Sequence, residues 1–76
     1  MKMDMFCKIM NRIRKTADSQ GEKYWNVNVR LNLVNGSSAL INLDAYELLD
    51  EFIQAFDQET DMLQFIPIEN IISASV

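Results

Sequence analysis

Apolar and polar residues alternate strictly from Trp25 to Leu33, and this alternation constrains the fold more than any other feature of the sequence. The polar positions within it are Asn26, Asn28, Arg30 and Asn32. This pattern is typical of a β-strand with one buried and one exposed face. Burying these amides under a second layer without hydrogen-bond partners would cost on the order of 1 to 3 kcal/mol each. We therefore expect a sheet with one open face.

A hairpin is predicted directly after this strand, because Asn35 and Gly36 form a strong turn signal. A two-residue loop would oppose Val29 with Asn42 and mix polar and apolar side chains on the core face. A three-residue loop that ends at Gly36, with this glycine at positive φ in a bulge, opposes Val29 with Ile41 and keeps the facing pairs apolar. We therefore predict the bulged register.

The segment after the hairpin carries the signals of a helix start. Asp44 can act as the N-cap and Glu47, three residues on, as its reciprocal cap. The apolar residues that follow have the spacing of one continuous helical stripe. They are Ala45, Leu48, Leu49, Phe52, Ile53 and Phe56. We predict a helix that begins at Ala45 and ends near Asp57 or Gln58, because negative charge is unfavourable at a helix C-terminus.

The two ends of the chain have weaker patterns. Met5 to Ala17 follows helical spacing and is predicted as a helix, with a strand as the alternative. Near the C-terminus, Leu63 to Ile66 and Ile71 to Ser75 are predicted as strands, separated by a turn or bulge at Pro67 to Asn70. A proline has no N–H to donate to a ladder, so the first of these strands is expected at a sheet edge.

These elements predict one α+β domain over residues 1–76. We expect a two-layer sandwich in which an antiparallel sheet carries its helices on one face, in the order α-β-β-α-β-β. If the first element is a strand, the order becomes β-β-β-α-β-β. A chain of 76 residues has no room for a second domain.

The residues that most enzymes use are scarce. The chain has no histidine, and its one cysteine, Cys7, lies in the predicted N-terminal helix, where a buried, inert thiol is expected. Gly21 and Gly36 belong to no nucleotide-binding fingerprint. We therefore expect a non-enzymatic protein without a cofactor. No apolar run reaches signal-peptide or membrane-spanning length, so we also expect a cytoplasmic protein with no membrane contact.

Charge is divided unevenly along the chain. All seven basic residues lie before residue 31, whereas eight of the 11 acidic residues follow it. The basic segment includes Lys8, Arg12, Arg14 and Lys15. With a net charge of −4 and few aromatic residues near this segment, direct nucleic-acid binding is not expected.

An acidic flank is the first candidate partner-binding surface, formed by Glu47, Asp50, Glu51, Asp57, Glu59 and Asp61. The last three have the spacing that opens a calcium loop, but Met62 stands where an EF-hand needs glycine and Ile68 where it needs glutamate, so no metal site is expected. The flank has two interpretations. It is a solvated surface, or it imitates nucleic-acid phosphates and occupies the basic groove of a nucleic-acid-binding enzyme, as inhibitors carried by phages and mobile elements do.

The open sheet face is the second candidate partner-binding surface, with Asn26, Asn28, Arg30, Asn32 and Leu40. Amides around an arginine suit hydrogen-bonded recognition of a peptide or of another sheet. An exposed leucine and an apolar C-terminal strand favour dimerisation by edge pairing or sheet packing. We therefore expect a protein-interaction module that binds another macromolecule as a homodimer. The acidic inhibitor, of anti-restriction or anti-CRISPR type with a basic partner, is the alternative.

Overall fold

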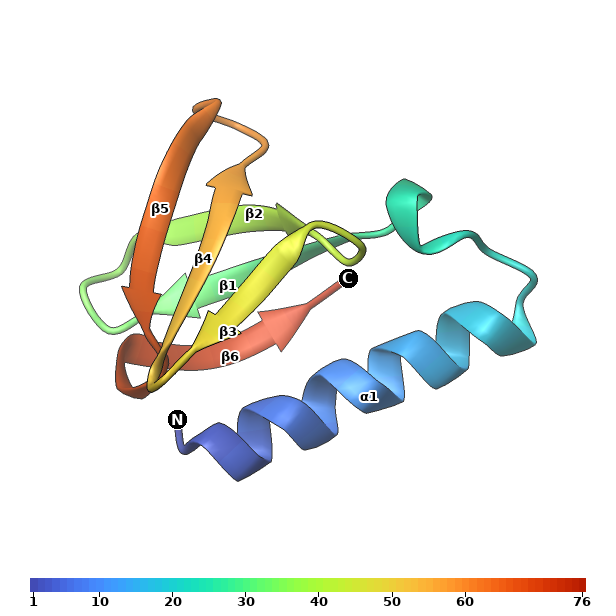
Figure 1. Ribbon diagram of the computed structural model, residues 1–76, viewed down its shortest axis with the longest axis horizontal. Helices are drawn as coiled ribbons and strands as arrows, with labels where there is room; N and C mark the ends of the chain where they lie inside the picture. The colour runs from blue at the N-terminus through green and yellow to red at the C-terminus, as the bar shows by residue number, and fades with distance from the viewer.

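The computed structural model describes residues 1–76 as one α-helix followed by six strands and two short 3₁₀ helices (Figure 1). The elements are α1 (Met3–Ser19), η1 (Tyr24–Asn26), β1 (Asn28–Leu33), β2 (Ser38–Asn42), β3 (Tyr46–Leu49), β4 (Phe52–Asp57), β5 (Met62–Pro67), η2 (Ile68–Asn70) and β6 (Ile71–Ser75). The strands form two antiparallel three-stranded sheets, of order β2-β1-β6 and β3-β4-β5. Strands of the two sheets cross in Figure 1, and the core lies between their inner faces.

The first hairpin has the predicted register. Val29 lies opposite Ile41 and Leu31 opposite Ala39, so apolar side chains share the core face. Gly36 has a φ of 85° in the turn, a conformation that glycine adopts at no steric cost. Turn geometry and the apolar pattern therefore agree, which fixes the register.

Strand β1 begins later than its alternating pattern predicts. Trp25 and Asn26 belong to η1, and 62% of the Trp25 surface is exposed. The N–H of Asn26 donates to the Lys23 carbonyl and that of Val27 to the Tyr24 carbonyl. These local 3₁₀ bonds replace the ladder bonds of a strand, so the prediction of a strand from Trp25 is wrong at its first three residues.

The predicted helix from Ala45 is wrong. This segment forms β3 and β4, which pair through a hairpin with a two-residue turn at Asp50 and Glu51. Asp50 has a φ of 52°, outside the helical region. The only α-helix is α1, so the predicted order α-β-β-α-β-β and its two helices on one face are wrong, while the α+β class and the antiparallel pairing are confirmed.

Asp44, predicted as the N-cap of a helix, lies instead in a turn between two strands. The Asn42 side-chain Oδ1 accepts a hydrogen bond from the N–H of Asp44 at 3.0 Å, and the Asn42 carbonyl accepts one from the N–H of Ala45 at 3.2 Å. Asparagine commonly stabilises turns in this way. At this corner the chain leaves β2 in the first sheet and enters β3 in the second.

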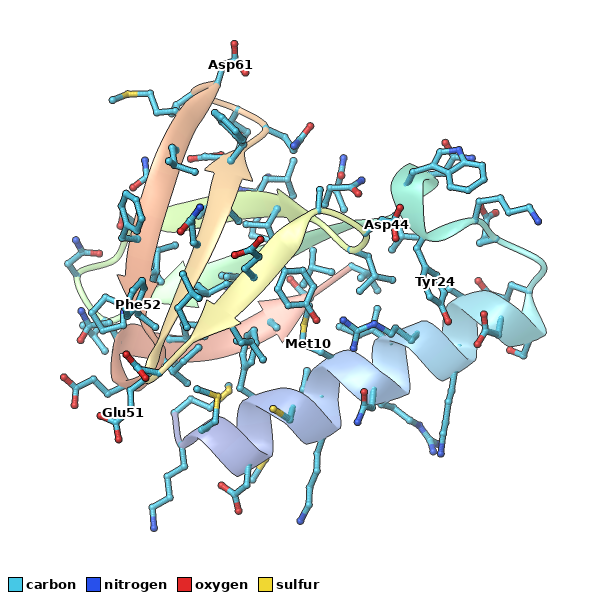
Figure 2. All side chains as sticks on the ribbon, in the orientation of Figure 1. Met10, Tyr24, Asp44, Glu51, Phe52 and Asp61 are labelled. Carbon is cyan, nitrogen blue, oxygen red and sulfur yellow. The ribbon has the colours of Figure 1, made fainter.

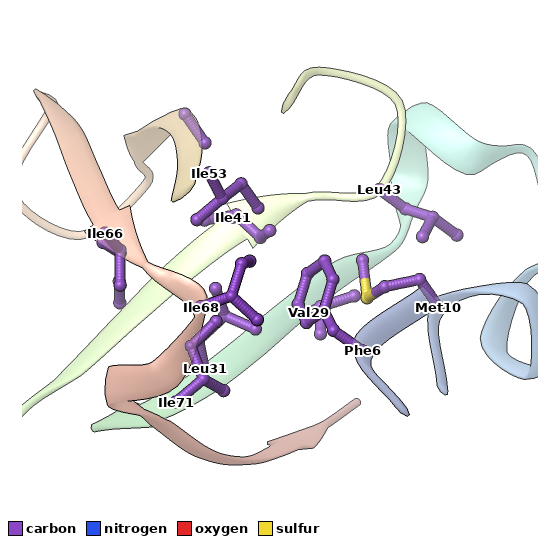
Figure 3. Packing of buried hydrophobic residues seen from close by; sticks show 12 residues of the cluster. Phe6, Met10, Val29, Leu31, Ile41, Leu43, Ile53, Ile66, Ile68 and Ile71 are labelled. Atoms are coloured by element: carbon purple, nitrogen blue, oxygen red, sulfur yellow. The ribbon is translucent and has the colours of Figure 1, made fainter. Parts of the chain in front are cut away.

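The N-terminal helix is confirmed and completes the core. Its Phe6 and Met10 are buried and lie against Val29 (Figure 3). The cluster of buried apolar residues draws on α1, both sheets and η2, and consists of Phe6, Met10, Val29, Leu31, Ala39, Ile41, Leu43, Ile53, Ala55, Ile66, Ile68 and Ile71. Helix α1 has 17 residues, and no helix of the structure is long and apolar enough to cross a membrane.

The C-terminal strands are confirmed. Strand β5 contains the predicted Leu63–Ile66 segment, and β6 matches the predicted Ile71–Ser75. The predicted turn between them contains the 3₁₀ helix η2. Strand β5 pairs only with β4, so it is an edge strand, as its proline predicts.

Candidate interaction surface

The outward side of the β3–β4–β5 sheet is apolar, and we call it the outer face. Strand pairing places Phe56 opposite Leu63 and Phe52 opposite Pro67 on this side. The exposed fractions of Phe56, Leu63 and Phe65 are 54%, 41% and 58%. The outer face comprises Leu49, Phe52, Phe56, Leu63, Phe65 and Pro67, with Glu47 and Gln54 among them.

Two aromatic rings are paired on this face. The ring centroids of Phe52 and Phe65 lie 6.2 Å apart with their planes tilted by 59°, an arrangement that aromatic pairs favour. Phe52 extends from the end of β4 that also carries Glu51 (Figure 2). Contiguous exposed apolar side chains of this size mark interaction sites in soluble proteins.

The outer face was not predicted from the sequence, because Phe52 and Phe56 fit the buried stripe of the helix expected there. The sequence nevertheless contains a signal for this face. Strand β4 has apolar residues on both of its sides, with Ile53 and Ala55 buried on one side and Phe52 and Phe56 on the other. A strand that is apolar on both sides is covered on both sides, either within its own fold or by a partner.

The predicted open sheet face exists on the other sheet. Asn28, Arg30, Asn32 and Leu40 lie on the outward side of β1 and β2, with Leu40 half-buried. Asn26 does not belong to this face, because it lies in η1. The guanidinium of Arg30 donates to Glu59 at 2.6 Å, and this hydrogen bond raises the pKa of Arg30. Arg30 is therefore already neutralised within the chain.

Asp57 is a structural residue. The residue is 4% exposed, and its carboxylate accepts hydrogen bonds from the N–H groups of Leu40 at 3.2 Å and Glu59 at 3.0 Å. Burial by itself raises the pKa of Asp57, but these bonds, together with those from Thr60, bring the pKa below its ordinary value. The carboxylate therefore stays ionised, and the backbone of β2 and the β4–β5 turn holds it.

The structure separates the residues of the predicted acidic flank. Asp57 is buried, and Glu59 is paired with Arg30. Glu51 and Asp61 lie at opposite ends of β4 (Figure 2). Asp50 and Glu51 form the β3–β4 turn, and Glu47 lies on the outer face beside Gln54. No group of acidic or cysteine side chains is arranged to hold a metal ion.

The basic residues of α1 have no acidic partners within the chain. Lys8, Arg12 and Lys15 are exposed and follow helical spacing, so they form a stripe along α1, which we call the basic stripe. The single ion pair of the structure joins Arg30 to Glu59. Arg14 points elsewhere, and its guanidinium lies over the Tyr46 ring, 5.4 Å from the ring centroid. Solvent or a partner therefore neutralises the basic stripe.

Cys7, the one thiol, is half-buried in α1. The most distinctive surfaces of the molecule are thus an exposed apolar sheet face, a polar sheet face and an unpaired basic stripe. Comparisons with protein-family models, with curated proteins and with solved structures found no match.

Proposed function

We propose that this chain is a non-enzymatic interaction module that binds another protein through its outer face. The observation that carries the proposal is the exposure of Phe56 and Phe65, each more than half exposed, on a sheet whose inner side already forms the core. Aromatic side chains are enriched in protein interfaces and supply most of their binding energy as hot spots. Water contact at such residues is unfavourable, and a partner removes it.

The rigid framework under the outer face supports the same proposal. Strand β4 lies in the middle of its sheet and is paired along its whole length with β5. The Phe52–Phe65 contact further restricts ring motion. A face that is ordered before binding loses little conformational entropy on association.

The acidic inhibitor has less support from the geometry. A mimic of nucleic acid needs closely spaced phosphate-like charges along one surface. In this chain one carboxylate of the flank is buried, another is paired with an arginine, and Glu51 and Asp61 are separated by the length of β4. We therefore retain binding through the outer face as the proposed function.

Affinity capture with matched variants tests the proposal. The tagged chain and its Phe56→Ser/Phe65→Ser variant are used to capture proteins from an extract of the organism that encodes it. We expect the wild type to retain a partner at both low and high salt, and the variant to lose it at least tenfold. Both rings are more than half exposed, so circular dichroism and the unfolding midpoint should change little.

Two control variants distinguish binding through the outer face from binding through acidic charge. Leu40→Ser makes the same kind of change on the polar face of the other sheet and should leave capture unchanged. Glu51→Gln/Asp61→Asn removes acidic charge of the flank away from the outer face and without removing apolar surface. Loss of the partner with this acidic variant, but not with the phenylalanine variant, would overturn the proposal in favour of the acidic inhibitor.

A further inference from the structure

Trp25, the one tryptophan of the chain, is held outside the core. It is 62% exposed, although it opens an alternating apolar pattern. The backbone around it is fixed, because the side-chain amide of Asn42 donates to the Trp25 carbonyl at 2.9 Å and the N–H of Val27 donates to the Tyr24 carbonyl at 3.0 Å. Tryptophan has a large apolar surface and is enriched where proteins contact other molecules. Trp25 is therefore a candidate binding residue that the outer face does not include.

Trp25 lines an open cleft with a volume of about 390 Å³. The cleft is formed by the C-terminal end of α1, the loop that follows it, η1 and the turn between β2 and β3. Its charged and aromatic lining residues are Asp18, Glu22, Lys23, Tyr24, Trp25 and Asp44. Tyr24 and Asp44 lie at the opposite end of the molecule from Phe52 (Figure 2). The cleft is therefore separate from the outer face.

The charge of this cleft is negative. Three carboxylates line it together with one ammonium group, that of Lys23, and none of the four takes part in the single ion pair of the structure. Arg12 lies beside Glu22 in a neighbouring hollow and offsets part of the negative charge. Asp18 and Asp44 supply the charge that exceeds these two cations. A concave surface with such an excess attracts positively charged ligands.

The arrangement of the carboxylates favours an organic cation over a metal ion. No group of acidic side chains in the structure is arranged to hold a metal, and Asp18 already accepts a hydrogen bond from the Tyr24 hydroxyl at 2.9 Å. A metal ion requires several oxygen ligands that converge on one point. The head of an organic cation is larger and more weakly hydrated, so it can contact carboxylates that are spread around an aromatic ring.

The Trp25 ring supplies the surface that such a head group requires. Alkylammonium and guanidinium groups are attracted to the face of an aromatic ring, and tryptophan attracts them most strongly. The single cation–π contact within the chain joins Arg14 to Tyr46, so no cation of the chain lies over Trp25. The ring is therefore free to contact a cation from outside the chain.

We propose that this cleft binds an organic cation, with the head group against the Trp25 ring and with Asp18 and Asp44 as the opposite charges. The ligand class comprises alkylammonium and guanidinium groups, carried either by a free small molecule or by a side chain of another protein. This second site goes beyond the proposed function, because it shares no residue with the outer face.

Titration of Trp25 fluorescence tests the site directly, because no other residue contributes tryptophan emission. Choline serves as the free alkylammonium probe, N-acetylarginine amide as the probe for an arginine side chain, and the neutral isostere of choline, in which carbon replaces nitrogen, as the control for shape. We expect a saturable change in emission with at least one of the two cations and several-fold weaker binding of the isostere. The cation that binds more tightly identifies the source of the ligand. Added salt should weaken binding, because it screens surface charge.

Two variants separate the contribution of the ring from that of the charge. Trp25→Leu keeps an apolar side chain but removes the aromatic ring, and its binding is followed by the broadening of the ligand's NMR signals. Asp44→Asn removes one charge from an exposed residue. Each should weaken binding of the tighter cation about threefold or more, the second chiefly at low salt. Phe56→Leu and Asp50→Asn make the same changes at exposed positions away from the cleft and should leave binding unchanged.

Three results would overturn the inference: no saturable binding of either cation, binding of the neutral isostere as tight as that of the cations, or unchanged affinity in both Trp25→Leu and Asp44→Asn. The Phe56→Ser/Phe65→Ser variant, which should lose the partner of the outer face, should bind the cation like the wild type. Failure of this site and failure of the proposed function are therefore distinguishable.

Discussion

The carboxylate of Asp57 in β4 accepts a hydrogen bond from the backbone N–H of Leu40 in β2, with an oxygen-to-nitrogen distance of 3.2 Å. The neighbouring N–H of Gln58 donates to the Leu40 carbonyl at 2.7 Å. These two bonds join β2, the end strand of one sheet, to the end of β4 in the other sheet. A buried carboxylate therefore makes one of the two bonds of this junction.

Asp57→Asn should destabilise the fold. The amide retains one acceptor oxygen, but it loses the charge and places an NH₂ group where the surrounding backbone offers only donors. Removing a buried, charge-assisted acceptor should lower the free energy of unfolding by about 1 to 3 kcal/mol. Urea denaturation measures the change, with Asp50→Asn in the exposed β3–β4 turn as the control. Equal midpoints for the two variants would contradict the assigned role.

The pKa of Asp57 predicts an acid limit to stability. Its folded pKa is lower than that of an unfolded aspartate, about 3.9, so the unfolded chain binds the additional proton in this range. The contribution of Asp57 is complete above about pH 4 and is lost as the pH falls through the folded pKa. Unfolding midpoints of the wild type and Asp57→Asn should therefore converge as the pH falls below about 4, the pKa of an unfolded aspartate. A constant difference over this range would show that the pKa is not lowered.

Arg14 and Tyr46 should be energetically coupled. The guanidinium lies 5.4 Å from the Tyr46 ring centroid and donates a hydrogen bond to the phenol oxygen, which ties α1 to β3. A double-mutant cycle with Arg14→Met and Tyr46→Phe should give a coupling of about 0.5 to 1.5 kcal/mol in urea unfolding. Arg12→Met, on the basic stripe, serves as the control and should show no coupling to Tyr46→Phe.

Truncation should cost far less stability at Trp25 than at Leu31, although both belong to the apolar positions of one alternating pattern. Trp25→Ala should change the free energy of unfolding by less than about 0.5 kcal/mol, because 62% of its surface is exposed. Leu31→Ala, at a fully buried position, should cost about 2 to 5 kcal/mol. Because Trp25 is the one tryptophan, its emission should also be readily quenched by acrylamide in the native state. A large loss of stability with Trp25→Ala would place it in the core.

Local signals predicted several elements correctly, and each of these elements has one consistent pattern. Met5 to Ala17 has helical spacing, and its helix buries Phe6 and Met10. The Asn35-Gly36 turn and the apolar pairs of the first hairpin require the same register. The proline at the end of β5 restricts this strand to an edge. In these segments short-range chemistry and tertiary packing favour the same structure.

The candidate site was only partly predictable. The open polar face follows from alternation and was found, apart from Asn26. The acidic flank was predicted as one surface because Glu47 to Asp61 was expected to form a helix and its adjoining loop. The segment forms strands and turns instead, so these acidic residues do not share one surface. The outer face was missed for the same reason, because a helix would have buried the phenylalanines that the strands expose.

By itself the sequence determined the α+β class, the first helix, the hairpin register, the two C-terminal strands and the uneven distribution of charge along the chain. Only the tertiary structure decided the segment from Asp44 to Asp57, whose apolar residues fit both a helical stripe and a strand apolar on both sides. The choice came from contacts outside this segment: β4 pairs with the following strand β5, and Asp57 accepts the Leu40 N–H 17 residues away. Local periodicity does not contain such contacts, because they exist only once both sheets have formed.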